Sequence, residues 1–311
     1  MKTLYNIYGI VFSIALNNEL VKLIIEKKFA HFKVIHNTCD VKCDMSIVEY
    51  DKEVFEPIVI QNNDPYYKID NNEIVLEKYG NSFLKWDLYK DQIGFYAADD
   101  DNHNAIGWRL IDYINNVLVT KGIFYIHASC YSQRGEGVVL CGECGAGKTS
   151  LSLKALENKK TIVSDDSTYF IEMDSKYFVL ANKLRPNIDE NNLSENFSYL
   201  GNNLVSDVHF YKKSVDISEI NFGFSDNLKI YPGYIFSLLD KKDTPQICSI
   251  SGASMAMRII KEFRAVSFFI HKQYTDFVIK LCRQTRNYTL FPSYCIDESY
   301  KLLESTINHF N

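Results

Sequence analysis

The apolar positions of the first hundred residues form short runs separated by polar turn clusters. The segment Leu4–Leu16 is apolar, β-branched and aromatic, which predicts a first strand. The stretch Glu19–Lys28 has the spacing of one early helix. The further short runs that predict strands are Phe32–Ile35, Phe55–Ile60, Glu73–Leu76 and Gln92–Tyr96, with polar clusters at Gln61–Pro65 and Asp70–Asn72. Residues 1–102 are therefore predicted to form a smaller, β-rich N-terminal domain.

Beyond the polar cluster Asp99–Asn104, which resembles a hinge, the pattern changes to alternating helices and strands. Ile106–Thr120 has helical spacing, and Ile123–Tyr131 predicts a strand. A turn at Gln133–Gly137 leads to a second strand at Val138–Cys141. A helix starting at Thr149 and a short strand at Thr161–Ser164 follow, with further strands and helices after them. The fold class predicted for residues 103–311 is α/β, with a mixed central sheet and helices.

Composition and charge narrow the class of protein. A chain of 311 residues with 46% hydrophobic content can build one or two cores, which excludes a disordered chain or a small disulfide-stapled module. The formal net charge of -5 argues against a nucleic-acid partner. The eight scattered cysteines are expected to be reduced thiols, and neither a cleavable signal peptide nor an uninterrupted run of 18 apolar residues is found. These features predict a cytoplasmic protein without a membrane partner.

The feature that carries chemistry is a glycine-rich loop between the strand Val138–Cys141 and the helix that follows. It matches the P-loop pattern, in which backbone N–H groups close around a polyphosphate and the helix N-terminus adds partial positive charge. The lysine of such a loop reaches the β and γ phosphates, and the Thr149 hydroxyl can ligate Mg²⁺. The predicted nucleotide-binding residues are Gly142, Glu143, Cys144, Gly145, Ala146, Gly147, Lys148, Thr149 and Ser150.

A pair of carboxylates and a histidine lie at informative distances from this loop. Asp165 and Asp166 end the strand Thr161–Ser164, 17 and 18 residues beyond Lys148. Two adjacent carboxylates can divide the work, one holding Mg²⁺ and the other accepting the proton of an attacking hydroxyl. His127 lies 21 residues before Lys148, on a strand that a hairpin would return to the loop. The alternatives are a turn or helix cap for the Asp pair and a structural role for His127.

Three weaker signals accompany the loop. Cys141 and Cys144 form a Cys-x-x-Cys pattern that overlaps it, as either a redox switch or an incidental spacing. A basic residue of the C-terminal half is expected to complete phosphate binding, with candidates Arg185, Arg258, Arg264 and Arg286. An irregularly spaced set in the N-terminal domain could bind a metal ion, namely His31, His36, Cys39 and Cys43.

Together, three motifs resemble the catalytic domain of HPr kinase/phosphorylase and HPr-kinase-related proteins. They are Phe124–Ser129, with the sequence Phe-Tyr-Ile-His-Ala-Ser, the loop Gly142–Thr149, and Val163–Asp166. The related kinases encoded with ribosomally made peptides, including lasso-peptide precursor kinases, are most similar in the His-Ala-Ser stretch. The glycine-rich second signature of the bacterial HPr enzymes is not found, and only Lys183–Pro186 lies in a comparable place.

The resemblance implies roles for individual residues. The loop, including Lys148, would bind the triphosphate. Asp165 would be the general base, His127 would orient or assist it, and Asp166 with Thr149 would hold Mg²⁺. The implied cofactors are ATP and Mg²⁺, and the resemblance leaves a homo-oligomer open.

The function expected from these observations is an ATP- and Mg²⁺-dependent kinase of the serine/threonine type. It would transfer the γ-phosphate to a hydroxyl of a peptide or protein acceptor, such as the precursor of a ribosomal natural product. Two alternatives remain open at this point. One is a nucleotide-binding regulatory module without phosphotransfer, and the other is a small-molecule kinase.

Overall fold

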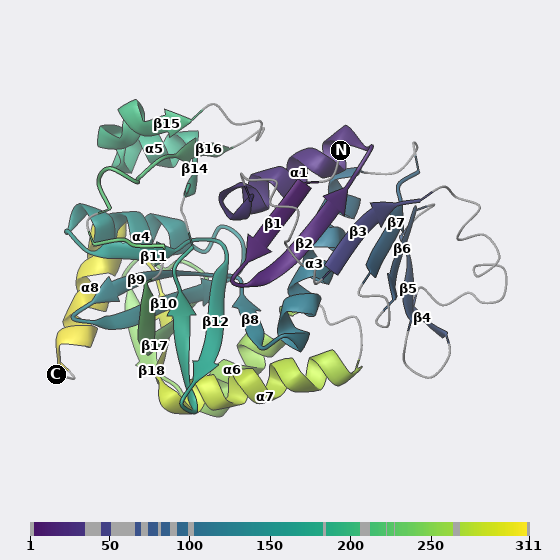
Figure 1. Ribbon diagram of the computed structural model, residues 1–311. Helices are drawn as coiled ribbons and strands as arrows, with labels where there is room; N and C mark the ends of the chain where they lie inside the picture. Colours follow the sequence, from purple (N-terminus) through teal and green to yellow (C-terminus); the bar gives the residue numbers. More distant parts are fainter. Residues whose placement is uncertain are drawn as a thin grey trace. The chain divides into compact units, whose positions relative to one another are not determined.

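The computed structural model describes residues 3–34, 45–50, 66–69, 74–79, 82–87, 92–98, 103–182, 185–205, 212–221, 223–226, 228–263 and 268–309 (Figure 1). By their internal contacts they form two compact units. One comprises Met1–Lys121 with Arg264–His271, and the other Gly122–Phe263 with Lys272–Asn311. The run Phe55–Ile60 and three of the four residues of the possible metal set, His36, Cys39 and Cys43, lie outside the described residues.

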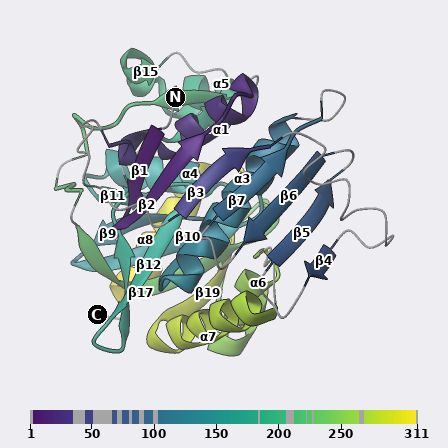
Figure 2. The same cartoon turned by 45° about the vertical axis from the view of Figure 1, so that its right-hand side comes forward.

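The first unit contains a seven-stranded mixed sheet in the order β1-β2-β3-β7-β6-β5-β4 (Figure 2). Its middle strands pair in parallel, β2 with β3 and β3 with β7, and the other pairs are antiparallel. The strands are β1 (Thr3–Ile7), β2 (Ile10–Ala15), β3 (Met45–Glu49), β4 (Tyr66–Ile69), β5 (Ile74–Tyr79), β6 (Ser82–Asp87) and β7 (Gln92–Tyr96). The described part of this region is thus rich in strands, and β7 has the bounds predicted for Gln92–Tyr96.

Two predicted strands of this unit are wrong. The first is a hairpin, because Tyr8 and Gly9 turn the chain between β1 and β2 with φ of 52° and 95°. Two successive positive φ angles are typical of a two-residue hairpin turn, and the continuous apolar pattern conceals it. The run starting at Phe32 is the end of a 3₁₀ turn (η1, Ala30–Phe32) followed by a single bridge between Lys33 and Tyr5.

The helices α1 (Glu19–Phe29) and α3 (His103–Thr120) complete the first unit. Asn18 caps α1 by accepting a hydrogen bond from the Val21 amide at 3.0 Å. The predicted hinge overlaps α3, whose first residue is His103. The unit boundary falls after Lys121, rather than after residue 102, because α3 packs closely on α1: a Cβ on Gly107 would lie 2.5 Å from Ile24 Cδ1.

The second unit contains a nine-stranded sheet in the order β11-β9-β10-β17-β13-β12-β8, in which β19 also pairs with β17 and β18 pairs with β19. The strands are β8 (Ile123–Ile126), β9 (Ala128–Gln133), β10 (Glu136–Gly142), β11 (Thr161–Ser164), β12 (Thr168–Met173), β13 (Lys176–Leu180), β17 (Lys229–Leu238), β18 (Gln246–Ser249) and β19 (Arg286–Phe291). The helices are α4 (Lys148–Glu157), α6 (Gly252–Ile260), α8 (Ile296–His309) and α7 (Phe268–Gln284), of which the part from Lys272 onward belongs to this unit. This mixed α/β architecture agrees with the predicted fold class.

The predicted strand Ile123–Tyr131 is two strands, interrupted at His127. β8 pairs with β12, whereas β9 pairs with β10 and β11, so the chain passes from one part of the sheet to another at this residue. The predicted turn after β9 is confirmed as a hairpin at Arg134 and Gly135, both with positive φ. The break places His127 at a strand end, where its side chain is not confined to the pleat.

The core of the second unit fixes the position of the glycine-rich loop. Leu140 of β10 and Leu151 of α4 are buried in a cluster with Leu303 of α8. A small lobe packs on α4 as well, where Leu193 and Phe197 join Leu153 in a second cluster. The lobe consists of β14 (Asn187–Asp189), α5 (Glu190–Asn196), η3 (Ser198–Asn203), β15 (Leu204–Val205) and β16 (Lys212–Val215). Both clusters hold α4 in place directly after the loop.

One side chain pairs with the outer strand β11 as a neighbouring strand would. Asn221 Nδ2 donates to Ile162 O and Asn221 Oδ1 accepts from Ile162 N, both at 2.8 Å. Both groups of Ile162 are buried and therefore need partners. The strand that leads to Asp165 is fixed in this way.

In the part of the chain that the structure describes, no helix has the length and hydropathy needed to cross a membrane.

Candidate functional site

The glycine-rich loop has the strand–loop–helix geometry that the sequence predicts. β10 ends at Gly142 and α4 begins at Lys148, with Gly147 as its N-cap at a φ of 101°. Gly142 has a φ of 148°, and a Cβ there would lie 2.7 Å from Leu238 O of β17. Only glycine fits a position with both properties. The backbone of β17 therefore leaves no room for a side chain at Gly142.

The start of α4 is suited to an anion. The first amides of a helix have no intrahelical acceptor, and the helix dipole adds partial positive charge to them. Residues at positive φ before the helix, Gly145 and Gly147, turn successive amides toward one concave side, which is a common geometry for binding phosphate. The loop can thus surround an anionic oxygen group with N–H donors.

Lys148 lies against the loop rather than in solvent. Its side chain is 7% exposed, and Nζ donates to Gly142 O at 2.7 Å and to Glu143 O at 3.0 Å. Burial lowers the pKa of this amine, although the carboxylates of Asp165 and Asp166 act in the opposite direction. The ammonium is held at the loop by neutral carbonyl oxygens, which an anion could replace as partners.

Asp165 follows β11 and is buried among hydroxyl donors. Thr149 Oγ1 donates to its two carboxylate oxygens at 3.0 and 3.1 Å, and Ser129 Oγ of β9 donates to Oδ1. Burial raises the pKa of Asp165, and the hydroxyl hydrogen bonds and Lys148 offset this only in part. The structure brings together two predicted site residues, Thr149 and Asp165.

Asp166 points elsewhere because the backbone reverses at this residue. Its φ is 58°, and Ser167 N donates to Asp165 O at 2.6 Å across the turn. Asp166 Oδ1 lies 3.1 Å from His127 Nε2, and the two side chains are 46% and 33% exposed. His127 is therefore paired with the second Asp, whereas the resemblance would have it assist Asp165.

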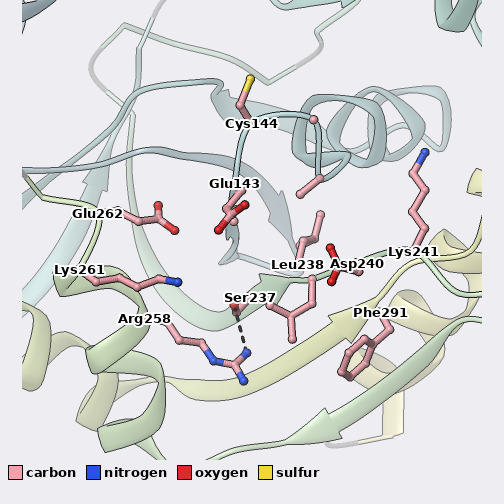
Figure 3. A pocket seen from close by; sticks show the side chains of 14 residues that line it. Glu143, Cys144, Ser237, Leu238, Asp240, Lys241, Arg258, Lys261, Glu262 and Phe291 are labelled. Carbon is pink, nitrogen blue, oxygen red and sulfur yellow. Dashed lines mark hydrogen bonds between the residues drawn. The ribbon is translucent and has the colours of Figure 1, made fainter.

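A pocket of about 540 Å³ opens on the β17 side of the loop (Figure 3). The ends of β17 and β19, the helix α6 and the residues after these elements form its walls. Its lining residues are Gly142, Glu143, Cys144, Gly145, Ala146, Ser237, Leu238, Leu239, Asp240, Lys241, Arg258, Lys261, Glu262 and Phe291. Glu262 belongs to this wall. Its carboxyl group also interacts electrostatically with His127 and Lys148 on the other side of the loop.

The remaining predicted residues are spread over the molecule. Ser150 accepts a hydrogen bond from Asn192 Nδ2 of the small lobe at 2.7 Å. Of the four arginines, Arg258 lines the pocket and Arg185 is exposed. Arg286 pairs with Glu136 at 3.4 Å. The fourth, Arg264, lies outside the described residues.

The two cysteines of the Cys-x-x-Cys pattern lie in different environments. Cys141 is buried, which raises the pKa of its thiol to about 12, and Cys144 is exposed in the pocket wall. Both are free thiols.

Several residues of the site escaped the sequence analysis. Ser129 lies in the His-Ala-Ser stretch, two residues after His127, so its position in a motif was the available signal. Ser237 and Thr289 had no such signal, because a hydroxyl at a buried strand position resembles any other core residue. Glu262 follows a helix among other charged residues.

No protein-family model matches the chain. No curated protein is significantly similar to it in sequence. Among solved structures, the HPr(Ser) kinase/phosphatase from Coxiella burnetii is similar with a TM-score of 0.33 and 12% identity, over 60% of this chain and 95% of that chain. Similarity at this level assigns neither a fold nor an activity.

Proposed function

We propose that the protein is a nucleotide- and Mg²⁺-dependent phosphotransferase that transfers the terminal phosphoryl group to a hydroxyl. The observation that carries the proposal is the pair of contacts beside the loop, Thr149 with Asp165 and His127 with Asp166. A glycine-rich loop alone would serve a binding protein equally well. A second, half-exposed carboxylate with a histidine partner beside the loop supplies a group that can accept a proton.

The donor set fits a magnesium ion. Thr149 and Asp165 supply a hydroxyl and a carboxylate, which are hard oxygen ligands of the kind that Mg²⁺ prefers. No group of three or more His, Cys, Asp and Glu side chains in the described residues could hold a metal by itself. This agrees with an ion that is bound by one or two protein oxygens and by nucleotide phosphates. Bound there, Mg²⁺ would neutralise charge on the transferred phosphoryl group.

The geometry favours an exchange of the roles that the resemblance implies for the two aspartates. Both oxygens of Asp165 already accept hydroxyl hydrogen bonds in a buried position, so this residue is suited to hold the metal with Thr149. Asp166 is half exposed and can meet an acceptor hydroxyl. His127 orients its carboxylate through Oδ1. In this proposal Asp166 is the general base. Lys148 and the loop amides bind the phosphates of ATP.

The acceptor proposed first is a Ser or Thr hydroxyl of a peptide or protein, in keeping with the three motifs. The exposure of Asp166 and His127 supports an acceptor that approaches from solvent. A small-molecule acceptor is the second candidate. It is favoured by the pocket of about 540 Å³, which is lined with compact charges and adjoins the loop.

A test that does not require the acceptor to be known uses water in its place. We expect the protein to hydrolyse γ-labelled ATP slowly in single turnovers that require Mg²⁺. Asp166→Asn should slow this step by about 10²–10⁴-fold without weakening ADP binding. His127→Ala should shift the pH dependence of the rate, because the imidazole partner of the base is lost. Asp165→Asn should raise the Mg²⁺ concentration needed.

The acceptor itself can be sought with Mg-ATP and the peptides encoded beside the gene, through a mass increase of about 80 daltons for one phosphate group. Nucleotide binding without any turnover, unchanged by Asp166→Asn, would instead identify a regulatory module.

A further inference from the structure

Arg258 crosses the floor of the pocket from α6 to two neighbouring strands (Figure 3). Its Nη1 donates to Thr289 Oγ1 of β19 at 2.8 Å and to Ser237 Oγ of β17 at 3.3 Å. Ser237 and Thr289 are register partners in this parallel pair, so their side chains leave the sheet on the same face. The two hydroxyls form a cradle for one edge of the guanidinium.

The guanidinium forms no ion pair with a carboxylate of the described residues. An arginine stays protonated in proteins and carries five N–H donors, of which the cradle engages only those of Nη1. Within the described residues, no carboxylate lies within 4 Å of Arg258. A half-buried cation held only by neutral hydroxyls leaves Nε and Nη2 for an anionic group.

Charged side chains of both signs surround Arg258 in the pocket wall. Lys241 and Lys261 also line the pocket, as do the carboxylates of Glu143, Asp240 and Glu262 (Figure 3). Across the described part of the chain, none of these five side chains has an ion-pair partner within 4 Å. Burial raises the pKa of Glu262, although the positive charges of Lys148 and Lys261 act in the opposite direction.

The helix that carries Arg258 is firmly positioned. A Cβ on Gly252 would lie 2.8 Å from Cys282 O, so the first turn of α6 touches the backbone of α7. Ser251 caps α6 through the Ser254 amide at 3.1 Å, and Met255 and Ile259 are buried. A guanidinium fixed from both its own helix and the strands loses little freedom when a ligand binds.

In the proposed function, the loop amides and Lys148 bind the phosphates of the donor. The cradle lies beyond them, on the strand pair β17–β19. A ligand that reaches Arg258 lies in the same pocket as the loop. Glu262, one turn after Arg258, interacts electrostatically with His127, the partner of the proposed base Asp166.

We propose that Arg258 forms an acceptor subsite for a phosphate or carboxylate group, separate from the loop that holds the donor. The inference rests on the proposed phosphotransferase function and narrows its acceptor to a hydroxyl compound or peptide that carries an anionic group. The hydroxyls of Ser237 and Thr289 position the guanidinium for this group.

The test is a binding experiment that requires no turnover. The full-length protein is saturated with Mg²⁺ and β,γ-methylene-ATP, so that the site of the γ-phosphate is filled, and inorganic phosphate is titrated by calorimetry. We expect phosphate to bind, and Arg258→Gln to weaken it at least tenfold, since a hydrogen bond to a charged group is lost. Thr289→Val, which removes one hydroxyl of the cradle, should weaken it by a smaller factor. Arg286→Gln is the matched control and should change neither affinity.

The affinity for the nucleotide analogue shows whether Arg258 binds an anionic group of the acceptor or the phosphates of the donor. An unchanged analogue affinity in Arg258→Gln, together with weakened phosphate binding, supports the acceptor subsite and also shows that the variant is folded. A tenfold loss of analogue affinity would overturn the proposal, because Arg258 would then bind the donor. Phosphate affinity that is equal in wild type and Arg258→Gln would overturn it as well. Failure of the wild type to bind the analogue would contradict the proposed function itself.

Discussion

Asp165 places a carboxyl group in a buried position, where its charged form is poorly solvated. Its side chain is 8% exposed, and its hydrogen-bond donors are neutral hydroxyls. A carboxylate in such surroundings lowers the stability of the native state at neutral pH. This loss of stability is consistent with the proposed function, in which the carboxylate of Asp165 binds a cation.

Asp165→Asn should therefore stabilise the fold while it impairs the proposed reaction. The amide keeps an oxygen for Ser129 and Thr149, and we expect a gain of about 1 kcal/mol near pH 7. The raised pKa of Asp165 means that the native state binds more protons than the unfolded state between about pH 3.9 and the raised value. Wild-type stability contributed by this group falls as the pH rises through that window, so the advantage of the variant should grow with pH and vanish in acid.

The measurement is thermal or urea unfolding across pH in the presence of a chelator. Asp174→Asn, in the exposed turn between β12 and β13, is the matched control and should show no such pH-dependent gain. Equal stability of wild type and Asp165→Asn at every pH would contradict the burial of a charged carboxylate here.

At this scale the sequence identifies the loop, Lys148, Thr149 and the Asp pair, because contiguous residues make the pattern. It does not reveal which aspartate meets which partner. That depends on the φ of 58° at Asp166, which sends adjacent side chains to different neighbours. A backbone reversal of this kind has no signature in Asp-Asp itself.

The junction of β10 with its loop has no room for a side chain. Gly142→Ala would place a methyl group against the Leu238 carbonyl at an unfavourable φ, at a cost of about 1–3 kcal/mol. We expect at least tenfold weaker ATP binding, because the loop must move away from β17. Gly201→Ala, in the open space of η3, is the control and should leave binding unchanged. ATP titration of both variants measures this, and equal affinities would show that the loop does not hold the nucleotide.

The strand β11 depends on one side chain from a distant loop. Asn221→Ala leaves the buried N–H and C=O of Ile162 without partners, which should cost about 2–4 kcal/mol in the free energy of unfolding. Asn202→Ala removes an exposed amide in η3 and should change stability by less than about 0.5 kcal/mol. Urea unfolding compares the two, and a small effect at Asn221 would mean that water replaces its contacts.

The sequence predicts most helices and the strand–loop–helix unit, since their periods extend over many residues. It merges β1 with β2 and β8 with β9. Each merged pair is apolar on both sides of a short break, at Tyr8-Gly9 and at His127, and the pattern averages over one or two residues. The break at His127 is set by pairing with different strands, which only the assembled sheet determines.

At the scale of the whole molecule, affinity for anions is local. The net charge of -5 opposes general attraction of polyanions, and the proposed phosphate partners are confined to one loop and one pocket wall. The two units also have their own cores, with the loop in the second. Pattern alone could not place α3 in the first unit, because a helix buried nearly all round shows no single apolar face.

Nucleotide binding should accordingly stabilise the second unit selectively. At a concentration 100 times its dissociation constant, Mg-ADP is expected to add about 2.7 kcal/mol to the stability of the unit that binds it. Hydrogen exchange should slow in β10, α4 and β11 and remain unchanged in β1 and β2. Lys148→Ala should lose the effect. If Mg-ADP slowed hydrogen exchange equally in both units, the result would contradict the inference that the units have separate cores.

The pairing of Asn221 with Ile162 has a further consequence, for association between molecules. A bare outer strand invites another chain to add to the sheet, and its hydrogen bonds would then be satisfied in an aggregate. Here a carboxamide already occupies the donor and the acceptor of Ile162. A strand of another molecule therefore finds the backbone groups of Ile162 already occupied. The end of β11, which leads to Asp165, still faces the loop.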